Sequence, residues 1–359
     1  MPIWCRFRNE KATIPRKNVF SALSGANLPA AGGSGQEAKG HLVPNIVTLT
    51  INPTVDIFVN VGRVESTRKM RCSAPKRDPG GGGINVARVV HRLGGSVAAI
   101  YPTGGSIGKL LQRLVEREGI TSLVTPSHVE TRESFTAYEE ETGEQYRFVL
   151  PGSALHRAEW EACLEKLSSL PFGPQFVVVS GSVPPGVPQD FFARAIRHAK
   201  ELGAQTVIDT SGAPLEAALE EGVSLIKANL VELIEFIGSP LQCDAEYIEA
   251  CRQLAAAGNA QAVALTLGEQ GAVLVTADRA WRALPMAIQV VSTVGAGDSF
   301  LGGMVTALAA GQSLEKAFGV AVAAGSAALL AAGTGLCREQ DVKRLLAEVK
   351  IGEVVKAAA

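Results

Sequence analysis

The sequence has few of the features that mark disulfide-rich, metal-binding or membrane proteins. Its 359 residues include 6 cysteines, which lie far apart without a C-x-x-C pair, so neither a disulfide framework nor a zinc site is indicated. No apolar run approaches the roughly 20 residues that a membrane helix needs. The longest run, residues 318–332, is rich in alanine and glycine and predicts a buried helix. These absences favour a soluble, cytoplasmic protein.

The chain also lacks an excess of either charge. Lys and Arg number 34 and Asp and Glu 35, which gives a formal net charge of -1. Such a chain has no broad basic field, so we expect neither nucleic acid nor an anionic membrane as a partner. Any anion must therefore be bound at a local site. Hydrophobic residues make up 47% of the chain, which is enough for a large core.

Residues 1–41 differ in composition from the rest of the chain. Basic residues come first, and a stretch rich in Ala, Gly and Ser comes after them. This composition predicts a disordered extension, most simply one without a function of its own. An organelle transit peptide is the alternative, although Glu10 is atypical of one and the apolar segment of a secretory signal is absent.

From Pro44 onward, short apolar segments alternate with helical ones. Strands are expected at 46–50, 97–101, 176–180, 206–209, 225–227 and 262–266, and helices at 84–93 and 109–118. Continuous apolar strands that alternate with helices predict an α/β domain over residues 42–359, with a mainly parallel sheet covered on both faces.

Two places break this alternation. Strand pairs with two-sided, partly polar patterns are expected at 56–61 with 69–74 and at 134–139 with 145–149. They predict a small antiparallel β lid, formed by about 56–77 and 131–150. Such a lid closes an active site in some enzymes, and its exposed edges also suit a dimer contact. We expect a homodimer through this lid, and the two roles are compatible.

The most informative stretch is residues 288–298. A strand-like segment at 288–291 leads into a glycine-rich turn, which opens a helix with free backbone N–H groups. Free N–H groups at a helix start form an anion site. Asp298 comes directly after the turn, where its carboxylate could take a proton from a nucleophile that attacks a bound phosphate. The plainer alternative is a carboxylate that only complements the helix dipole.

A second glycine-rich stretch spans residues 80–83. Four consecutive glycines weaken any helix or strand, so the backbone there is expected to approach a ligand closely. Asn85, in the first turn of the next helix, could hydrogen-bond a hydroxyl of that ligand. An ordinary flexible loop is the alternative. A dinucleotide fingerprint is disfavoured because the G-x-G-x-x-G spacing is absent.

These two stretches, with two motifs between them, resemble the ribokinase-like (PfkB) carbohydrate kinases. The signatures are GGGINVA at 81–87 and TVGAGD at 293–298, and between them stand NLVE at 229–232 and TLGEQG at 266–271. The resemblance covers about residues 45–350. It implies a three-layer α/β/α fold with a small antiparallel β lid, a sugar or sugar phosphate as substrate, ATP as co-substrate and Mg²⁺ as cofactor.

Finer features are most similar to the phosphofructokinase branch of that family. They include KMRCSAP at 69–75, GEQYRF at 143–148 and SGSVPPG at 180–186. The implied reaction is ATP-dependent phosphorylation of fructose 6-phosphate at its C1 hydroxyl, a glycolytic step. Phosphorylation of fructose 1-phosphate or tagatose 6-phosphate stays open, as does a sugar-phosphate-binding protein without catalytic activity.

The resemblance also implies roles for single residues. Asp298 is the expected general base, and the N–H groups of Gly295, Ala296 and Gly297 are expected to stabilise the transferred phosphoryl group. The expected sugar-phosphate site comprises Asp56, Gly81, Gly82, Asn85 and Arg132, with Lys69, Arg147 and Ser182 as further candidates. A solvated turn carboxylate and a surface charge are the plainer interpretations of Asp56 and Arg132.

The remaining implied roles concern ATP and cations. The nucleotide is expected at Lys227, Asn229, Thr266, Gly268 and Gly271. Asn229 and Glu232 are expected to hold Mg²⁺, directly or through its waters, although Glu232 could instead cap a helix. Backbone carbonyls at Ser292, Val294, Ala328, Ala331 and Gly333 are candidates for binding K⁺.

Overall fold

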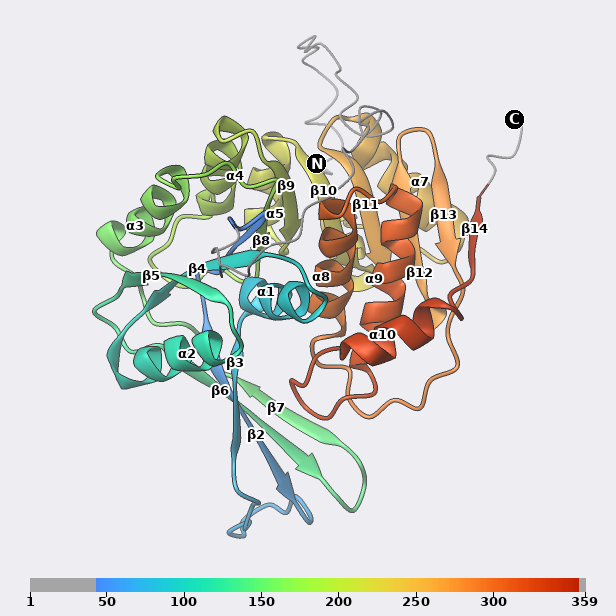
Figure 1. The fold of residues 1–359 in the computed structure, drawn as a ribbon. Coiled ribbons are helices and arrows are strands. Elements are labelled where there is room, and N and C mark those ends of the chain that lie inside the picture. The colour runs from blue at the N-terminus through green and yellow to red at the C-terminus, as the bar shows by residue number, and fades with distance from the viewer. Residues whose placement is uncertain (1–42, 355–359) are drawn as a thin grey trace, which may run out of the picture.

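A ten-stranded sheet between two layers of helices forms the body of the molecule, and a four-stranded sheet projects from one edge of it (Figure 1). This computed structural model describes residues 43–354. The extension predicted at residues 1–41 lies outside the described residues. The α/β class predicted from the alternating pattern is confirmed.

The large sheet runs in the order β14-β13-β12-β11-β10-β9-β8-β1-β4-β5. Its strands are β1 (Ile46–Leu49), β4 (Val97–Thr103), β5 (Thr121–Pro126), β8 (Phe176–Ser180), β9 (Gln205–Asp209), β10 (Val223–Asn229), β11 (Ala260–Thr266), β12 (Ala272–Thr276), β13 (Ala280–Ala283) and β14 (Ile351–Glu353). Neighbours from β5 to β11 pair in parallel, and β12 to β14 add an antiparallel edge.

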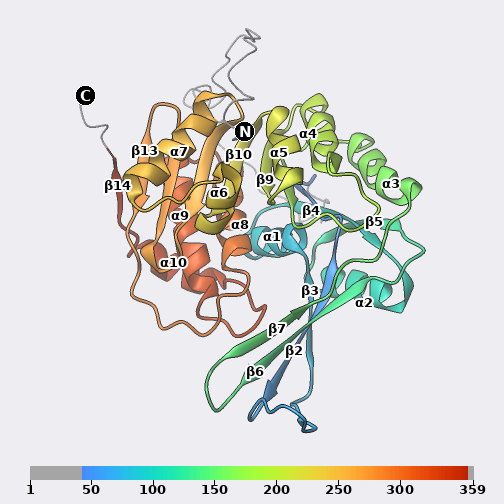
Figure 2. The ribbon, with the colours of Figure 1, turned by 180° about the vertical axis from the view of Figure 1, so that it is seen from behind.

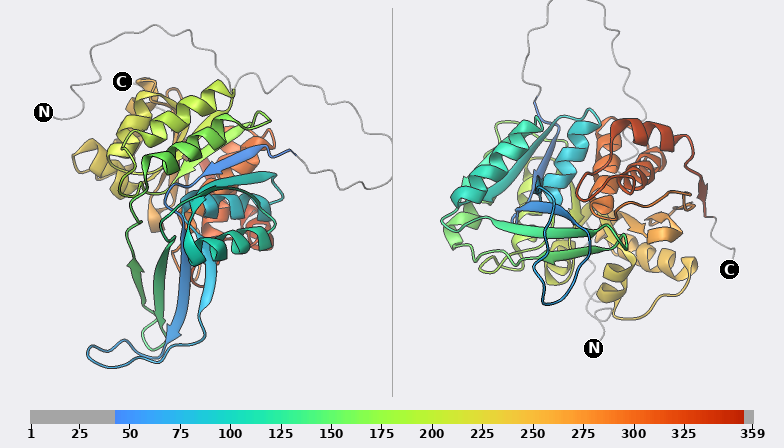
Figure 3. Two further views of the ribbon diagram at one scale, coloured as in Figure 1. Left: turned by 90° about the vertical axis from the view of Figure 1, so that its left-hand side faces the viewer. Right: turned by 90° about the horizontal axis from the view of Figure 1, so that it is seen from below.

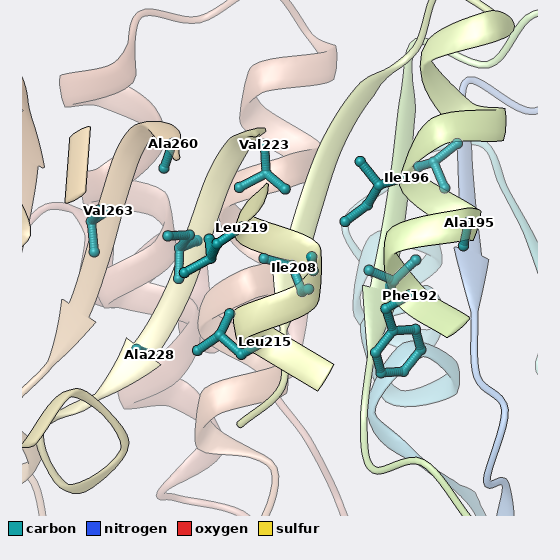
Figure 4. Close-up of a cluster of buried hydrophobic side chains, with 14 of the residues drawn as sticks. Phe192, Ala195, Ile196, Ile208, Leu215, Leu219, Val223, Ala228, Ala260 and Val263 are labelled. Atoms are coloured by element: carbon teal, nitrogen blue, oxygen red, sulfur yellow. The ribbon is translucent and has the colours of Figure 1, made fainter. Parts of the chain in front are cut away.

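Helices cover both faces of this sheet. One layer contains α3 (Arg157–Ser168), α4 (Phe191–Glu201), α5 (Ala213–Glu220), α6 (Leu230–Ile237) and α7 (Asp244–Ala256). The other layer contains α1 (Gly82–Arg92), α2 (Gly105–Arg117), α8 (Ala296–Ala309) and α9 (Leu314–Ala328), and α10 (Glu339–Leu346) packs against α9 (Figure 2). Consecutive residues of one strand pack into opposite layers, as Val207 and Ile208 do in β9. Figure 4 shows Ile208 beside residues of α4 and α5. Burial on both faces explains the continuously apolar strands.

The strands and helices predicted in the main body are present with small shifts at their ends. The segment predicted at 176–180 coincides with β8, and the helix predicted at 84–93 begins two residues earlier, at Gly82. The Ala/Gly-rich run that begins at Phe318 lies largely in α9, most of whose apolar residues are buried. No helix in the part of the chain that the structure describes combines the length and the apolar character needed to cross a membrane.

The projecting sheet is the β lid. It consists of β3 (Lys76–Gly80), β2 (Thr54–Val61), β6 (Arg132–Glu139) and β7 (Gln145–Val149), in that order. The outer pairs are antiparallel, and the central pair of β2 and β6 is parallel.

The strand predicted at 69–74 is wrong. That segment makes a single bridge, from Cys72 to Val61, and β2 pairs instead with β3. Residues 69–74 are all exposed, so no buried face fixes their register.

The strand predicted at 288–291 is also wrong. The segment is a loop whose Val291 N–H donates to the Leu329 carbonyl at 2.8 Å. It cannot extend the large sheet beyond β13, because β14 already pairs with that strand. Val290 and Val291 are therefore left exposed.

The strand order determines where a ligand can bind. The chain leaves β1 for β4 and β5 on one side, and it later adds β8 to β11 on the other side. In open parallel sheets, ligands bind outside the carboxyl ends of the strands at the point where the order reverses. Here that point lies between β1 and β8, and the lid begins directly after β1 (Figure 3).

Candidate active site

A cavity of about 240 Å³ lies where the β lid meets the first turns of α1 and α8. The first lining residue in the sequence is Thr54, which comes shortly after the end of β1. The cavity therefore lies close to the point where the strand order reverses. It gathers predicted site residues that are distant in the sequence: Asp56, Gly81, Gly82, Asn85, Arg132, Arg147, Val294, Gly295 and Asp298. The fold therefore brings both glycine-rich stretches and the lid together.

The start of α8 has the geometry of an anion site. Gly295 is the residue before the first turn and has φ 75°, a conformation that favours glycine. The next N–H groups have no partner within the helix. A Cβ at Gly297 would lie 3.0 Å from Nζ of Lys227, so a cationic side chain lies against the same turn. Helix terminus and ammonium group together favour a phosphate there.

Asp298 lies in this first turn. Its Oδ2 accepts a hydrogen bond of 2.9 Å from Nδ2 of Asn85 in α1. Burial, together with the nearby carboxylate of Asp209, raises the pKa of Asp298 to about 6, although Asn85 and Lys227 oppose the increase. The carboxylate is thus ionised at neutral pH and more basic than an ordinary aspartate, as a general base requires.

Lys227 is held by a carboxylate for which the sequence predicted no role in the site. Its Nζ lies 3.1 Å from Oδ1 of Asp209, and both side chains are largely buried. Burial lowers the pKa of Lys227, but Asp209, Glu232 and Asp298 outweigh it and the net shift is upward. Lys227 therefore stays protonated. Asp209 is the last residue of β9, and Lys227 lies near the end of the neighbouring strand β10. These positions at adjacent strand ends are the signal from which the contact could have been predicted.

Asp56 and Arg132 form the lid side of the cavity. Burial raises the pKa of Asp56 to about 6, and the positive charge of Arg132 opposes this increase. The guanidinium is fixed by two backbone carbonyls, because Nη1 donates to Leu150 at 2.8 Å and Nη2 donates to Asn52 at 3.0 Å. Arg147 lies on the adjacent strand β7. The cavity thus has two cationic groups that come from the lid strands β6 and β7.

Two of the residues predicted for the sugar-phosphate site lie outside the cavity lining. Lys69 is in the exposed segment between β2 and β3. Ser182 lies just after β8, and its Oγ accepts a hydrogen bond of 2.9 Å from Nδ2 of Asn52. Ser182 is therefore one residue removed from Arg132, whose guanidinium donates to the Asn52 carbonyl.

Comparison with known proteins agrees with this geometry. The model of the "pfkB family carbohydrate kinase" matches residues 50–341. The chain belongs to the pfkB family of carbohydrate kinases. A relative from Mycobacterium tuberculosis, the "ATP-dependent 6-phosphofructokinase isozyme 2", is 45% identical over 301 residues, which are 84% of this chain and 88% of the relative. The "1-phosphofructokinase" of Xanthomonas campestris is 34% identical over 266 residues, 73% of this chain and 83% of that protein.

Solved structures of phosphofructokinase-2 from Escherichia coli share the fold of this pfkB-family kinase. The complex with substrates and products has a TM-score of 0.81 and 38% sequence identity, and it covers 85% of this chain and 99% of its own. The complex with potassium has a TM-score of 0.82 at the same identity and coverage. The ribokinase-like fold implied by the sequence resemblance is confirmed.

The predicted nucleotide residues of this kinase lie at two neighbouring strand ends. Asn229 at the end of β10 is the register partner of Thr266 at the end of β11. After β11, Gly268 begins a short 3₁₀ turn and Gly271 follows it, with φ of 60° and 94°. The segment from Asn229 to Glu232 forms a capping box, in which each side chain accepts from the other residue's backbone N–H at 2.9 and 2.8 Å. Both residues thus also stabilise the start of α6.

The predicted cation residues of the kinase lie on two loops and at the end of α9, and the two loops contact each other. Oγ of Ser292 lies 3.3 Å from the Gly333 carbonyl, and it accepts from the N–H of Val294 at 3.2 Å. Ala328, at the end of α9, accepts from the N–H of Ala331 at 3.0 Å. On the lid, Nε2 of Gln145 donates to the Val291 carbonyl at 3.2 Å. No role was predicted for this glutamine, because only the fold brings β7 to that loop.

Proposed function

We propose that this pfkB-family kinase transfers the γ-phosphate of ATP to the C1 hydroxyl of fructose 6-phosphate, giving fructose 1,6-bisphosphate and ADP. The observation that carries the proposal is the position of Asp298. A basic carboxylate lies at a helix terminus suited to a phosphate, in a cavity that is also lined by Arg132 and Arg147 of the lid. The 45% identity to the mycobacterial phosphofructokinase supports this choice of substrate.

In the proposed mechanism, Asp298 takes the proton of the C1 hydroxyl as its oxygen attacks the γ-phosphorus. The new O–P bond forms as the bond to the β–γ bridging oxygen breaks, and ADP leaves. The N–H groups of Gly295, Ala296 and Gly297 and the ammonium of Lys227 stabilise the charge on the transferred group. These donors are held before reaction, so little reorganisation is needed.

The sugar phosphate is proposed to lie between the two glycine-rich stretches and the lid. Asp56 and Asn85 hydrogen-bond hydroxyl groups of the sugar. Gly81 and Gly82 have no side chains, so the sugar can approach their backbone closely. The phosphate lies near Arg132, with Arg147, Lys69 and Ser182 as further contacts. A guanidinium has five N–H donors, and Arg132 uses one on each of two carbonyls. It is held in place and keeps donors for phosphate oxygens.

ATP is proposed to lie along the ends of β10 and β11, against Lys227, Asn229, Thr266, Gly268 and Gly271. Asn229 and Glu232 fit a hydrated Mg²⁺, since both offer oxygen atoms and Glu232 uses one carboxylate oxygen in the capping box. Mg²⁺, when bound, neutralises part of the triphosphate charge.

A monovalent cation is proposed beside the α8 terminus. Backbone carbonyls at Ser292, Val294, Ala328, Ala331 and Gly333 would bind K⁺, and the potassium-containing structure of the E. coli relative supports this. Turnover measured in K⁺ and in an equal concentration of a large organic cation tests the site, and equal rates would contradict it.

We also propose that two copies of the chain pair through the β lid. Phe148, Val149 and Leu150, at the end of edge strand β7, are largely exposed, and exposed apolar edges are usually covered. A monomer mass in sedimentation equilibrium at micromolar concentration would contradict this pairing.

The reaction is tested by identifying its product. The enzyme is incubated with MgATP and fructose 6-phosphate, and the phosphate positions in the product are assigned by ³¹P NMR. We expect a second phosphate on C1 with the wild type, and none with Asp298→Asn under the same conditions. ADP formed without a C1 phosphate would overturn the proposal.

A further inference from the structure

A buried arginine, Arg88, contacts Asn85, the residue that hydrogen-bonds Asp298. The Arg88 side chain, in α1, is 1% exposed. Nη1 donates to Oδ1 of Asn85 at 3.2 Å and to the Pro79 carbonyl at 2.9 Å. Nε donates to Glu118 at 2.8 Å. An unbroken path of hydrogen bonds therefore runs from Arg88 through Asn85 to Asp298.

This path fixes the direction of the Asn85 amide. A guanidinium only donates hydrogen bonds, so the amide atom that faces Arg88 must be the oxygen. The amide nitrogen then faces Asp298, to which it donates at 2.9 Å. If the amide were reversed, its oxygen would face the carboxylate, and two acceptors would oppose each other.

We propose that Arg88 is a positioning residue for catalysis, because it holds the Asn85 amide in the one direction that supports an ionised Asp298 and leaves Oδ1 of that carboxylate for the substrate hydroxyl. The inference rests on the proposed function of Asp298 as the base. Arg88 does not line the cavity and acts through Asn85.

The charges around Asp298 explain why the direction matters. Asp209 from β9 and Asp56 from β2 raise its pKa, whereas Lys227 from β10 and the Asn85 amide lower it. Loss of the amide donor leaves Lys227 alone against burial and two carboxylates. The fraction of ionised base at a given pH then falls, and the acid limb of the pH–rate profile moves to higher pH.

The test must separate this role from the burial of Arg88 in an ion pair with Glu118. The Arg88→Met change is therefore made in a Glu118→Gln background, so that Glu118 is not left as a carboxylate without Arg88. Glu118→Gln alone, in which Arg88 keeps Asp78 at 3.8 Å, is the matched control. In Glu118→Gln, the contact between Arg88 and Asn85 is kept. Arg88→Lys is a second variant, which keeps the charge but not the forked geometry.

Steady-state kinetics over pH 5 to 9 give the expected result. In Glu118→Gln, kcat and the acid limb stay close to wild type. Addition of Arg88→Met lowers kcat about tenfold, the size of one charge-assisted hydrogen bond, and moves the acid limb upward, while the KM for ATP stays within about twofold. Arg88→Lys shows a smaller change in the same direction and decides the question if the Met variant does not fold.

A third background shows whether the effect passes through Asn85. In Asn85→Ala, the same change at Arg88 should alter kcat by less than about twofold, because the amide is already gone. An undiminished loss in that background, or an unchanged kcat and acid limb in both Arg88 variants, would overturn the inference. If instead the wild type and Glu118→Gln fail to phosphorylate fructose 6-phosphate, it is the proposed function that fails.

Discussion

Replacement of Asp298 by Asn is expected to remove activity and to stabilise the protein. The pKa of Asp298 is raised from 3.8 to about 6, chiefly by burial, so the folded state holds the proton more tightly than the unfolded state. Ionisation therefore costs stability, and the cost grows as pH rises from about 4 to about 6 and is complete above that. Asparagine resembles the protonated carboxyl and avoids this cost.

The magnitude depends on the size of the shift. About two pKa units at about 1.4 kcal/mol each give an upper limit of about 3 kcal/mol for the stability gained at pH 8. About half of that gain should remain at pH 5, where part of the wild-type carboxyl is already protonated. Turnover should fall by about 10²–10⁴-fold, the usual effect of losing a general base.

Urea unfolding of both proteins at pH 8 and pH 5, with turnover measured on the same preparations, checks the prediction. The asparagine variant should have the higher midpoint at pH 8 and a smaller advantage at pH 5. Turnover within tenfold of wild type would refute the role of Asp298 as the base. A variant less stable than wild type at pH 8 would refute the account of its burial.

Three further substitutions test separate parts of the site. Arg132→Ala should raise the KM for the sugar phosphate at least about tenfold more than the KM for ATP, and equal increases would contradict a phosphate contact. Gly82→Ala places a Cβ against Oγ of Ser180 and should destabilise the protein by about 1–3 kcal/mol; thermal unfolding measures this, and Ser180→Ala should partly restore stability. Glu232→Gln keeps a side chain that can cap α6, so it should raise the Mg²⁺ concentration needed for half-maximal activity several-fold without a lower melting temperature. An unchanged Mg²⁺ requirement would contradict a role in metal binding.

The elements predicted correctly are those whose signal is local. Strand β8 is a run of five buried residues, and such runs separated by helices predict a parallel sheet with little further information. The turns at Gly81 and Gly295 are likewise predicted by the glycine-rich sequence, and both residues adopt the positive φ that favours glycine.

The errors at 69–74 and 288–291 have a common physical cause. An extended segment becomes a strand only if a free sheet edge is available, and that depends on residues far away in the chain. Residues 76–80 pair with β2 in one case, and β14 occupies the edge of the large sheet in the other. Neither competitor can be inferred from the pattern of the segment itself.

The parts of the site that escaped prediction are contacts between distant residues. Asn85 and Asp298 are 213 positions apart, and no local pattern shows that their side chains meet. Arg88 lies one helical turn after Asn85, and a charged residue within the apolar part of a helix is a faint signal of a buried partner. Its contact with the amide oxygen becomes visible only in three dimensions.

The most direct test of the central proposal is a comparison of kcat/KM for three sugar phosphates. ADP release is followed with fructose 6-phosphate, fructose 1-phosphate and tagatose 6-phosphate, under saturating MgATP. The proposed function predicts the highest value for fructose 6-phosphate, by at least about tenfold. A higher value for fructose 1-phosphate or tagatose 6-phosphate would contradict it.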